Sequence, residues 1–443
     1  MITAEQIATA GVVGAGGAGF PTHVKLSGKA DTVVINAAEC EPLLHKDKEL
    51  IVRYPDRIAA GLQIAMELTG AKNGVVGIKK KYTHAIDILQ KALTSSLSVC
   101  PLDDAYPSGD EFVLVYETLR RVIPPGGIPL AVGAVVMNVE TVFNVANAAE
   151  GIPVTEKYVS VAGEVEHPYS VKVPIGAPLY SLLPSSLFPL PSSLTCVVGG
   201  AMMGYIETDL TKPVTKTTGG IIVLPKDHFI VQQKSWDWQK TQRVGRASCD
   251  QCSFCTELCP RNLLGHPIEP HRAMRSLGFN ASKQSDVPGT AFCCECNLCS
   301  YYSCPEGLNP KDVCCENKRR ILAEKKRWEN PPFRPERAER IMPNRKTPTH
   351  RLIQRIGLAK YLNKAPLIDK QIGVSEVVIP LKQHIGAACV PVVKQGDKVS
   401  VGQPIAVRPV SDGKPALGAD IHASVSGTVI EISDTLIRTV AES

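Results

Sequence analysis

The chain has 443 residues, of which 44% are hydrophobic and 21% are charged. These proportions lie near the globular average and exclude wholesale disorder and a membrane-embedded protein. At roughly 100–200 residues per domain the length predicts several domains, and the formal net charge is +6.

The N-terminus shows none of the features of a secretory signal, because no basic segment followed by an apolar segment is present. The longest apolar stretch, residues 128–136, is far shorter than the roughly 18–20 residues that a spanning helix needs. We therefore expect a cytoplasmic protein. Because that compartment disfavours structural disulfides, clustered cysteines there indicate metal binding or redox chemistry.

The first part of the chain alternates apolar runs with stretches of helical periodicity. Strand-like runs occupy residues 33–35, 74–78 and 112–115, and helical spacing occupies residues 2–10, 49–68 and 83–93. This alternation predicts a layered α/β domain over residues 1–155.

A glycine-rich stretch, Gly-Ala-Gly-Gly-Ala-Gly, occupies residues 14–19 and is followed by Lys25. It presents backbone amides with little side-chain obstruction, as a phosphate-binding loop requires. Because a helix and no clear strand precedes it, the stretch differs from the usual dinucleotide fingerprint. On glycine content alone, a tight structural turn and a nucleotide site are equally supported.

Short, closely spaced strand signals follow at residues 158–161, 169–173, 195–198 and 221–224. They predict a small β-rich domain over residues 156–235. A Gly-Gly-Ala-Met-Met-Gly turn lies between the last two of these strands, at residues 199–204.

Eleven of the fifteen cysteines lie between Cys249 and Cys315, in a region that we delimit as residues 240–325. A Cys-x2-Cys-x2-Cys-x3-Cys-Pro motif, the spacing of bacterial ferredoxins, begins at Cys249, and a second copy with one extra residue before its last cysteine begins at Cys293. The motifs predict two [4Fe-4S] clusters in a ferredoxin-like helical domain. In such proteins the fourth cysteine of each motif binds the other cluster. The predicted ligands are Cys249, Cys252, Cys255 and Cys304 for one cluster, and Cys293, Cys296, Cys299 and Cys259 for the other.

Structural zinc is the alternative for these cysteines, but paired zinc ligands leave the third cysteine of each triplet unexplained. Three cysteines fall outside the motifs, namely Cys294, Cys314 and Cys315. Either Cys314 or Cys315 could replace Cys304 if the longer loop misplaces it. Two clusters in one chain indicate electron transfer.

Residues 318–360 carry 14 Lys and Arg against 4 Asp and Glu, a local charge of +10 over a body of −4. We interpret residues 326–370 as a basic, extended and solvated linker after a charged helix, with docking to an acidic partner as the alternative. Few aromatic residues accompany the charge, so nucleic-acid binding has little support. Short strands with glycine turns follow, and we delimit a last domain as residues 371–443.

Four stretches in this order resemble the flavin-bearing, NADH-oxidising subunits of respiratory complex I: residues 14–25, 36–42, 106–111 and 138–141. The resemblance implies a Rossmann-like domain that binds FMN and NADH. It also implies a set of cofactor-binding residues, with Glu111 as the catalytic candidate. These are Gly14, Gly16, Gly17, Phe20, Lys25, Asn36, Glu39, Tyr106, Gly109, Asp110, Glu111, Asn138 and Thr141.

The sequence departs from that family at three positions. Ala38 stands where the family has Asp, Asp110 where it has Glu, and Gly28 where an aromatic residue would help Phe20 to sandwich the adenine. The resemblance therefore supports FMN better than tight binding of NADH.

A flavin domain followed by two cluster motifs resembles the RnfC-type subunits of Rnf electron-transport complexes and the cobalamin reductases of propanediol-utilisation microcompartments. Both resemblances imply a soluble-ligand-binding β-grasp (SLBB) domain between flavin and clusters, and a barrel-sandwich hybrid domain. In the Rnf proteins the latter comes first, whereas here it is C-terminal, as in the cobalamin reductases. That order favours the reductases.

The favoured resemblance implies that electrons pass from NADH through FMN and two [4Fe-4S] clusters to cob(III)alamin, giving cob(II)alamin. It also implies a microcompartment location, with cobalamin, a cobalamin-handling enzyme or shell proteins as partners. The alternatives are an Rnf-like electron-transport subunit and a non-catalytic iron-sulfur scaffold.

Overall fold

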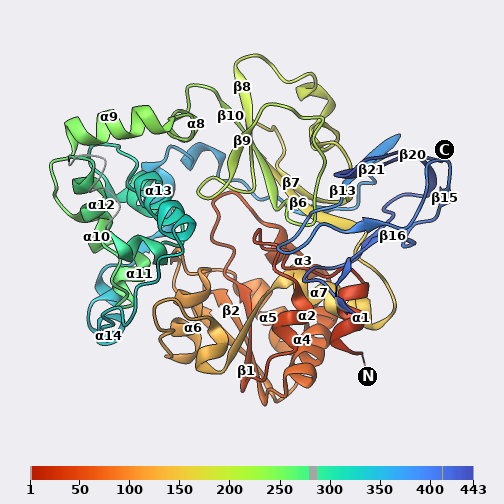
Figure 1. The fold of residues 1–443 in the computed structure, drawn as a ribbon, viewed down its shortest axis with the longest axis horizontal. Coiled ribbons are helices and arrows are strands. Elements are labelled where there is room, and N and C mark those ends of the chain that lie inside the picture. The colour runs from red at the N-terminus through yellow and green to blue at the C-terminus, as the bar shows by residue number, and fades with distance from the viewer. Residues whose placement is uncertain (1, 279–286, 412, 443) are drawn as a thin grey trace.

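The computed structural model describes residues 2–278, 287–411 and 413–442. An N-terminal α/β region lies at the bottom of Figure 1, a mixed sheet lies above it, cysteine-rich helices lie to the left and C-terminal strands lie to the right. Residues 279–286, which fall inside the expected two-cluster domain, lie outside the described residues.

The N-terminal region is built on a parallel sheet of order β3-β2-β1-β5. Its strands are β1 (Thr32–Ala37), β2 (Asn73–Lys79), β3 (Leu97–Leu102) and β5 (Ala134–Asn138). The associated helices are α1 (Ala4–Thr9), α2 (Thr22–Leu26), α3 (Lys46–Arg53), α4 (Pro55–Thr69), α5 (Thr83–Ala92), α6 (Glu111–Leu119) and α7 (Val139–Ala149). A short 3₁₀ helix, η1 (Pro129–Val132), leads into β5.

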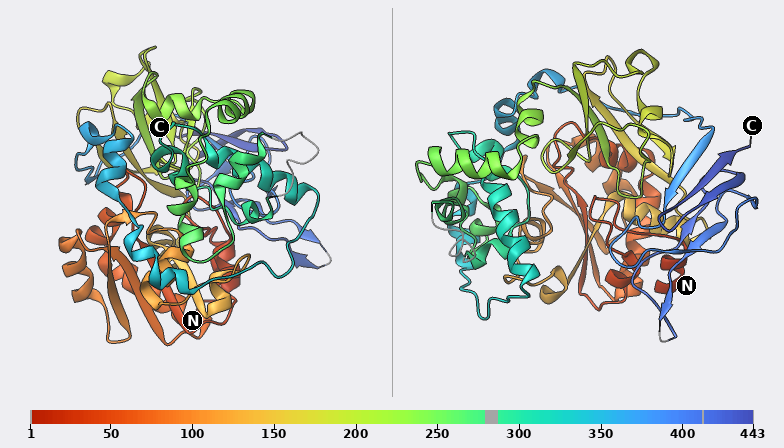
Figure 2. Two further views of the ribbon diagram at one scale, coloured as in Figure 1. Left: turned by 90° about the vertical axis from the view of Figure 1, so that its left-hand side faces the viewer. Right: turned by 45° about the horizontal axis from the view of Figure 1, so that its top comes forward.

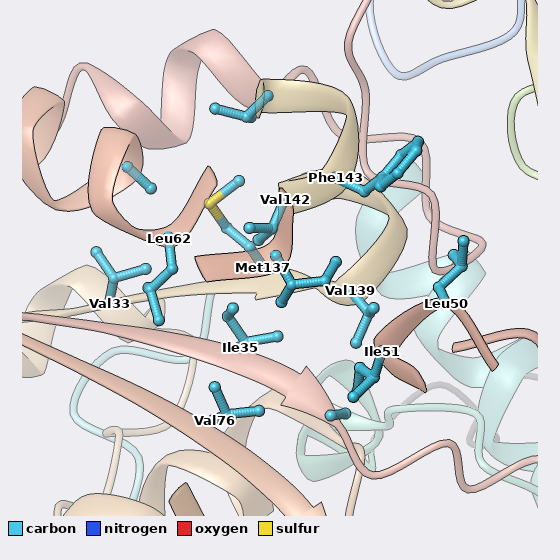
Figure 3. Packing of buried hydrophobic residues seen from close by; sticks show 14 of the residues in the cluster. Val33, Ile35, Leu50, Ile51, Leu62, Val76, Met137, Val139, Val142 and Phe143 are labelled. Carbon is cyan, nitrogen blue, oxygen red and sulfur yellow. The ribbon is translucent and has the colours of Figure 1, made fainter. Parts of the chain in front are cut away.

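Apolar side chains of the strands and of α4 and α7 form the core of this region. Val33, Ile35, Leu62, Val76 and Val142 are fully buried and pack together, as Figure 3 shows. Such burial, at about 25 cal/mol per Å² of apolar surface, is the main source of stability here.

Two sequence expectations in this region are wrong. Residues 112–115, predicted as a strand, lie in α6, where the Asp110 side chain caps the helix by accepting from the backbone N–H groups of Phe112 and Val113. A short apolar run does not distinguish a buried helix from a strand, and the cap decides between them. The helix expected over residues 49–68 is two helices, because Pro55 begins α4.

The second region is a six-stranded mixed sheet of order β12-β7-β6-β10-β8-β9. Its strands are β6 (Glu156–Gly163), β7 (Tyr169–Pro174), β8 (Leu194–Val198), β9 (Tyr205–Glu207), β10 (Gly220–Pro225) and β12 (Leu367–Ile368), and two 3₁₀ helices follow β7, η2 (Leu179–Leu182) and η3 (Ser185–Leu187). β6 and β7 pair antiparallel, whereas β6 and β10 pair parallel. The four expected strands of this region are all present.

Short helices carry the cysteine motifs. They are α8 (Phe229–Lys234), α9 (Trp238–Ser248), α10 (Phe254–Glu257), α11 (Pro260–Leu263), α12 (Pro270–Ser276), η5 (Pro288–Phe292), η6 (Cys299–Ser303) and α13 (Pro310–Ala323). η6 is a π-helical turn and lies at the extra residue of the second motif. An insertion of one residue is commonly accommodated in this way.

The basic segment is not extended along its length, which corrects the expectation of a solvated linker. It contains α14 (Glu336–Arg340), η7 (Met342–Asn344), β11 (Thr347–Pro348), α15 (Thr349–Arg355) and η8 (Ala359–Tyr361). β11 pairs with β4 (Ala105–Tyr106), and β12 pairs with β7. Backbone pairing and the burial of Leu352 and Ile353 hold the segment on the body despite its charge.

The C-terminal strands form two small sheets around one apolar core. The first has the order β13-β21-β20-β15 and the second β14-β16-β19, and a β17-β18 hairpin extends from them. Their bounds are β13 (Glu376–Pro380), β14 (Val390–Pro391), β15 (Lys398–Val399), β16 (Pro404–Val407), β17 (Val410–Ser411), β18 (Lys414–Pro415), β19 (Ile421–His422), β20 (Gly427–Ile432) and β21 (Leu436–Ala441). Buried Val377, Ile405 and Val429 lie between the sheets.

This C-terminal module packs against the start of the chain, and Figure 2 shows its strands beside the N-terminal helices. The backbone N–H of Ile385 donates to the carbonyl of Gly19 at 3.0 Å. Arg408 pairs with Glu5 at 2.6 Å and with Asp420 at 2.9 Å. The last domain of the chain therefore braces the glycine-rich stretch. Within the described residues, no helix has both the length and the apolar character needed to cross a bilayer.

Candidate functional site

A cavity of about 720 Å³ lies between the parallel sheet and the mixed sheet. The ends of β1 and β5 and the glycine-rich stretch form one wall, and the 199–205 and 215–219 segments of the mixed sheet form the other. Every cofactor-binding residue expected from the sequence lines this cavity. Its position at the carboxyl ends of parallel strands is where α/β sheets commonly bind ligands.

The glycine-rich stretch forms a tight loop at the cavity wall. Gly14 donates its N–H to the carbonyl of Phe20 at 2.8 Å, and Gly19 donates to the carbonyl of Gly14 at 3.2 Å. Gly17 has a φ of +111° and no atom within 4 Å of the place that a Cβ would take. The loop therefore leaves backbone exposed to a ligand at a conformation that other residues rarely adopt.

Lys25 and Glu111 form an ion pair at the cavity. The Lys25 ammonium lies 2.7 Å from the Glu111 carboxylate and donates to the carbonyl of Val136 at 3.0 Å. Its side chain is 28% exposed and that of Glu111 is 40% exposed. Both charges are thus fixed in position while a ligand in the cavity can still reach them.

Glu39 is held in a strained position at the end of β1. Its φ is +39°, in the left-handed region, and its carboxylate accepts the backbone N–H groups of Asp47 at 2.8 Å and Lys48 at 3.3 Å. Burial, and then the Asp47 carboxylate, raise the pKa of Glu39 to about 7. Strain of this kind is often found at functional sites.

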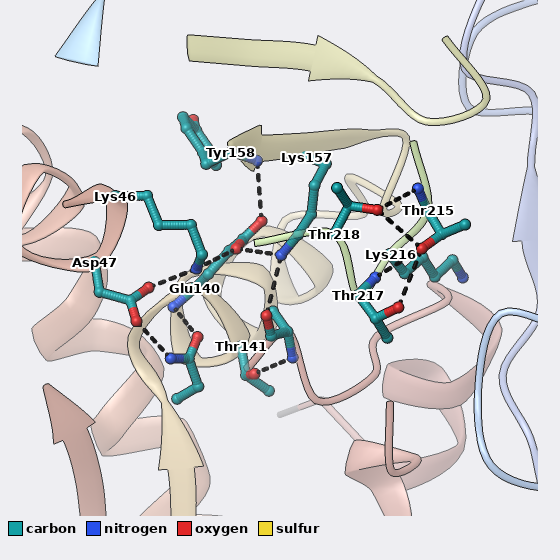
Figure 4. A network of polar contacts seen from close by, with 12 residues as sticks. Lys46, Asp47, Glu140, Thr141, Lys157, Tyr158, Thr215, Lys216, Thr217 and Thr218 are labelled. Atoms are coloured by element: carbon teal, nitrogen blue, oxygen red, sulfur yellow. Dashed lines mark hydrogen bonds and ion pairs between the residues drawn. The ribbon is translucent and has the colours of Figure 1, made fainter. Parts of the chain in front are cut away.

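A buried ion network that the sequence reasoning missed lies beneath the cavity (Figure 4). Glu140 is 1% exposed and pairs with Lys46 at 2.8 Å and with Lys157 at 2.5 Å. Lys46 also pairs with Asp47, whose other oxygen accepts from the Asn138 amide at 2.7 Å. The Asn-Val-Glu-Thr stretch was the available signal, since it placed Glu140 between two expected site residues.

Two further cavity residues carry buried polar groups. The Thr22 hydroxyl has no hydrogen-bond partner among the described residues, although the residue is only 1% exposed. Glu41 accepts the backbone N–H groups of Met202 and Met203, both at 2.8 Å, and so ties the 199–205 segment to the parallel sheet. A buried donor without a partner is costly, so the Thr22 hydroxyl fits a polar ligand atom in the cavity.

One group of cysteines adjoins the cavity. Cys259, Cys293, Cys296 and Cys299 line a small neighbouring pocket together, and Cys296 lines both spaces. Burial first, and then the thiols of Cys293 and Cys259, raise the pKa of Cys299. These four are the ligands expected for one cluster.

A second group lies farther from the cavity. Burial, followed by the nearby thiols of Cys304, Cys249 and Cys252, raises the pKa of Cys255 to about 12. The π-helical turn thus brings Cys304 to the first motif. Crowded thiols of this kind ionise readily only beside compensating positive charge, which iron supplies.

Three cysteines outside the motifs lie close to the first of these groups. Cys314 and Cys315 are hydrogen-bonding neighbours of Cys293 and lower its pKa. Cys294 lies at the cavity wall beside Cys296. Within the described ranges, no three His, Cys, Asp or Glu side chains are arranged to hold a single metal ion.

Two polar contacts connect the cavity with its neighbouring cysteine group. The Tyr106 hydroxyl donates to the carbonyl of Cys296 at 2.7 Å. Arg261, two residues after Cys259, pairs with Asp110 at 2.8 Å, and both side chains are about nine-tenths buried. The two sites share one rigid wall.

Three protein families match separate parts of the chain. Residues 7–147 match the Nuo51 FMN-binding domain, residues 248–309 the 4Fe-4S dicluster domain and residues 356–443 the RnfC barrel sandwich hybrid domain. The fold and the sites thus define an oxidoreductase that uses FMN and 4Fe-4S clusters. The expected cofactor classes are confirmed.

The relatives identify the family more narrowly. The chain is 41% identical over 438 residues, 98% of its length and 96% of the relative, to "Cobalamin reductase PduS" of Salmonella typhimurium. The chain belongs to the PduS family, as its resemblance to the reductases predicts.

A second relative and one solved structure are more distant. The chain is 34% identical to the RnfC-type component of the Na⁺-translocating ferredoxin:NAD⁺ oxidoreductase complex of Acetobacterium woodii, over 58% of each chain. An NAD⁺-reducing [NiFe]-hydrogenase structure covers 74% of this chain and 63% of its own, with 19% identity and a TM-score of 0.48.

Proposed function

We propose that this protein passes electrons from NADH through FMN and two [4Fe-4S] clusters to cob(III)alamin, which becomes cob(II)alamin. The observation that carries the proposal is the single cavity that gathers every expected flavin-site residue and shares the wall of Cys294 and Cys296 with a cysteine group. The full-length relatives named cobalamin reductase supply the acceptor.

The cavity residues fit a flavin nucleotide. Open backbone at Gly17 and the unpartnered Thr22 hydroxyl offer hydrogen-bonding groups to a phosphate or ribityl chain. Lys25 adds a fixed positive charge. When bound, the flavin accepts two electrons as a hydride and returns them one at a time.

The chain's own residues then position the reactants. Glu111 holds the Lys25 ammonium, and its exposed carboxylate can accept a hydrogen bond from a ligand in the cavity. Glu39, with its backbone held by strain and its carboxylate by Asp47 and Lys48, offers a second acceptor. We assign the expected cofactor-binding residues and the eight motif cysteines to these sites.

An order for the two clusters follows from the contacts. The cluster of Cys259, Cys293, Cys296 and Cys299 adjoins the flavin cavity, because Tyr106 and Arg261 connect the two sites. The cluster of Cys249, Cys252, Cys255 and Cys304 is farther along, and Cys252 is exposed. Electrons therefore enter at the first and leave at the second.

The domain limits expected from the sequence remain our proposal. The parallel sheet supports a Rossmann-like domain. The antiparallel β6-β7 pair with β10 parallel to β6 supports an SLBB β-grasp domain over residues 156–235. Kinship with a propanediol-utilisation reductase supports a location in a microcompartment, with shell proteins as partners.

An Rnf-like role is the second candidate, supported by the relative from Acetobacterium woodii. Anaerobically purified protein would be given NADH and then cob(III)alamin, with flavin and corrinoid absorbance followed together. We expect flavin bleaching and cob(II)alamin formation. Bleaching without corrinoid reduction, in protein with full iron, would favour the Rnf-like role, and the absence of bleaching would leave a scaffold.

A further inference from the structure

The loop that holds the outer cysteine group lies at the surface. Cys252 is exposed, and Phe254, two residues later, is 46% exposed. Figure 1 shows α9, α10 and α12 along the outer edge, on the side away from the C-terminal strands. The outer group is thus the part of the electron path that a second molecule can approach.

The helices beside this loop carry positive charge alone. α9, which ends directly before Cys249, contains exposed Lys240, Arg243 and Arg246 and no carboxylate. α12 packs against both α9 and α10 and contains exposed Arg272 and Arg275, again with no carboxylate.

The acidic residues nearby do not cancel this charge. Glu269 pairs with Arg272 at 3.0 Å, and Glu257 pairs with Arg345 at 3.1 Å. Asp250 is exposed in the loop itself. The face therefore keeps an excess of arginine around one exposed aromatic ring, which is the composition of a docking surface with a small apolar centre and a charged rim.

We propose that this basic face, formed by α9, α12 and the 249–255 loop, docks an acidic one-electron carrier protein that takes electrons from the outer cluster. The inference rests on the proposed function, because it uses the same electron path. Each NADH oxidised gives NAD⁺, one proton and two electrons, so two carrier molecules are reduced. Complementary charge would favour a fast, short-lived encounter of the kind that redox partners use.

The test uses the full-length holoprotein and a plant-type ferredoxin as the acidic probe, with binding measured directly and NADH-driven reduction measured alongside. The double variant Arg243→Glu with Arg246→Glu should weaken binding by roughly tenfold or more and abolish most of its salt dependence. Lys91→Glu, an equal reversal on exposed α5, is the matched control and should change neither.

Arg272→Glu on the other helix provides an independent variant if the double variant loses iron. Binding that is unchanged in the reversals, independent of salt, or equally weakened in Lys91→Glu would overturn the proposal. So would binding to phosphatidylglycerol vesicles with none to ferredoxin, which would assign the face to a lipid surface. Failure of the wild type to reduce cob(III)alamin would count against the proposed function and leave ferredoxin binding intact.

Discussion

At the scale of single residues, the ion pair of Lys25 and Glu111 is the clearest fixed charge in the cavity. The Lys25 ammonium is oriented by two acceptors, so a bound phosphate or flavin oxygen would meet it without reorganisation. Lys25→Ala should therefore lower the flavin content of the purified protein, as measured by flavin absorbance per chain. Lys29→Ala, which removes an exposed lysine nearby, is the control, and equal flavin content in both variants would refute the assignment.

Glu39 gives a prediction about pH. In flavin-free protein its folded pKa is about 7, against 4.5 in the unfolded chain. The folded state thus binds this proton more tightly, so the residue's stabilising contribution is complete below pH 4.5 and is lost as pH rises through 7. The shift corresponds to about 3 kcal/mol.

We therefore expect the free energy of unfolding of Glu39→Gln, relative to wild type, to rise by about 3 kcal/mol between pH 4.5 and pH 8. Urea unfolding at several pH values would measure it. Glu150→Gln, at a carboxylate that is 57% exposed, should run parallel to the wild type. Parallel curves for Glu39→Gln as well would show that its proton is not held by burial.

At the scale of elements, the turn η6 explains why an irregular motif still supplies its last ligand. The extra residue before Cys304 is taken up by a π-helical turn, which leaves Cys304 beside Cys255. The sequence showed the insertion but not its conformation, because a single residue can be accommodated in a loop, a bulge or a helix.

The two cysteine groups should respond differently to substitution. Cys252→Ala should remove about half of the iron yet leave the cluster beside the flavin reducible by NADH, because the near ligands are intact. Cys259→Ala should also remove about half and should stop electrons from reaching the remaining cluster. Iron analysis and electron paramagnetic resonance after NADH addition would measure both. Cys100→Ala should keep all its iron, and full iron in Cys252→Ala would disprove the partition.

Sequence patterns predicted the cavity well and the layers beneath it poorly. The strands at residues 33–35 and 74–78 lie in β1 and β2, because continuous apolar runs of that length reflect burial on both faces. Residues 112–115 show the same run in a helix that the Asp110 cap begins. Lys46 and Lys157 meet Glu140 only through tertiary packing, so no local pattern could announce that network.

At the scale of the whole molecule, the C-terminal module is fastened to the N-terminal helices by a buried arginine. The Arg408 side chain is 5% exposed and pairs with Glu5 and with Asp420, which is itself 10% exposed. Arg408→Ala would leave the Asp420 carboxylate without its partner, at a cost of about 3–5 kcal/mol.

We expect Arg408→Ala to loosen the module and to raise the rate at which flavin dissociates, since Ile385 would no longer hold Gly19. Limited proteolysis and flavin fluorescence would follow the two effects. Arg438→Ala, which breaks pairs within the same module at Glu376 and Glu431, should leave flavin release unchanged. Equal flavin release in wild type and Arg408→Ala would show that the contact does not support the loop.

The contact between Ile385 and Gly19 also sets a sequence of events during synthesis. The glycine loop is among the first parts of the chain to leave the ribosome, and the strand region that braces it is among the last. Domains generally fold from the N-terminus as they emerge. A nascent chain would thus carry the expected flavin residues long before their loop is supported, and we expect stable cofactor loading to await release of the finished polypeptide.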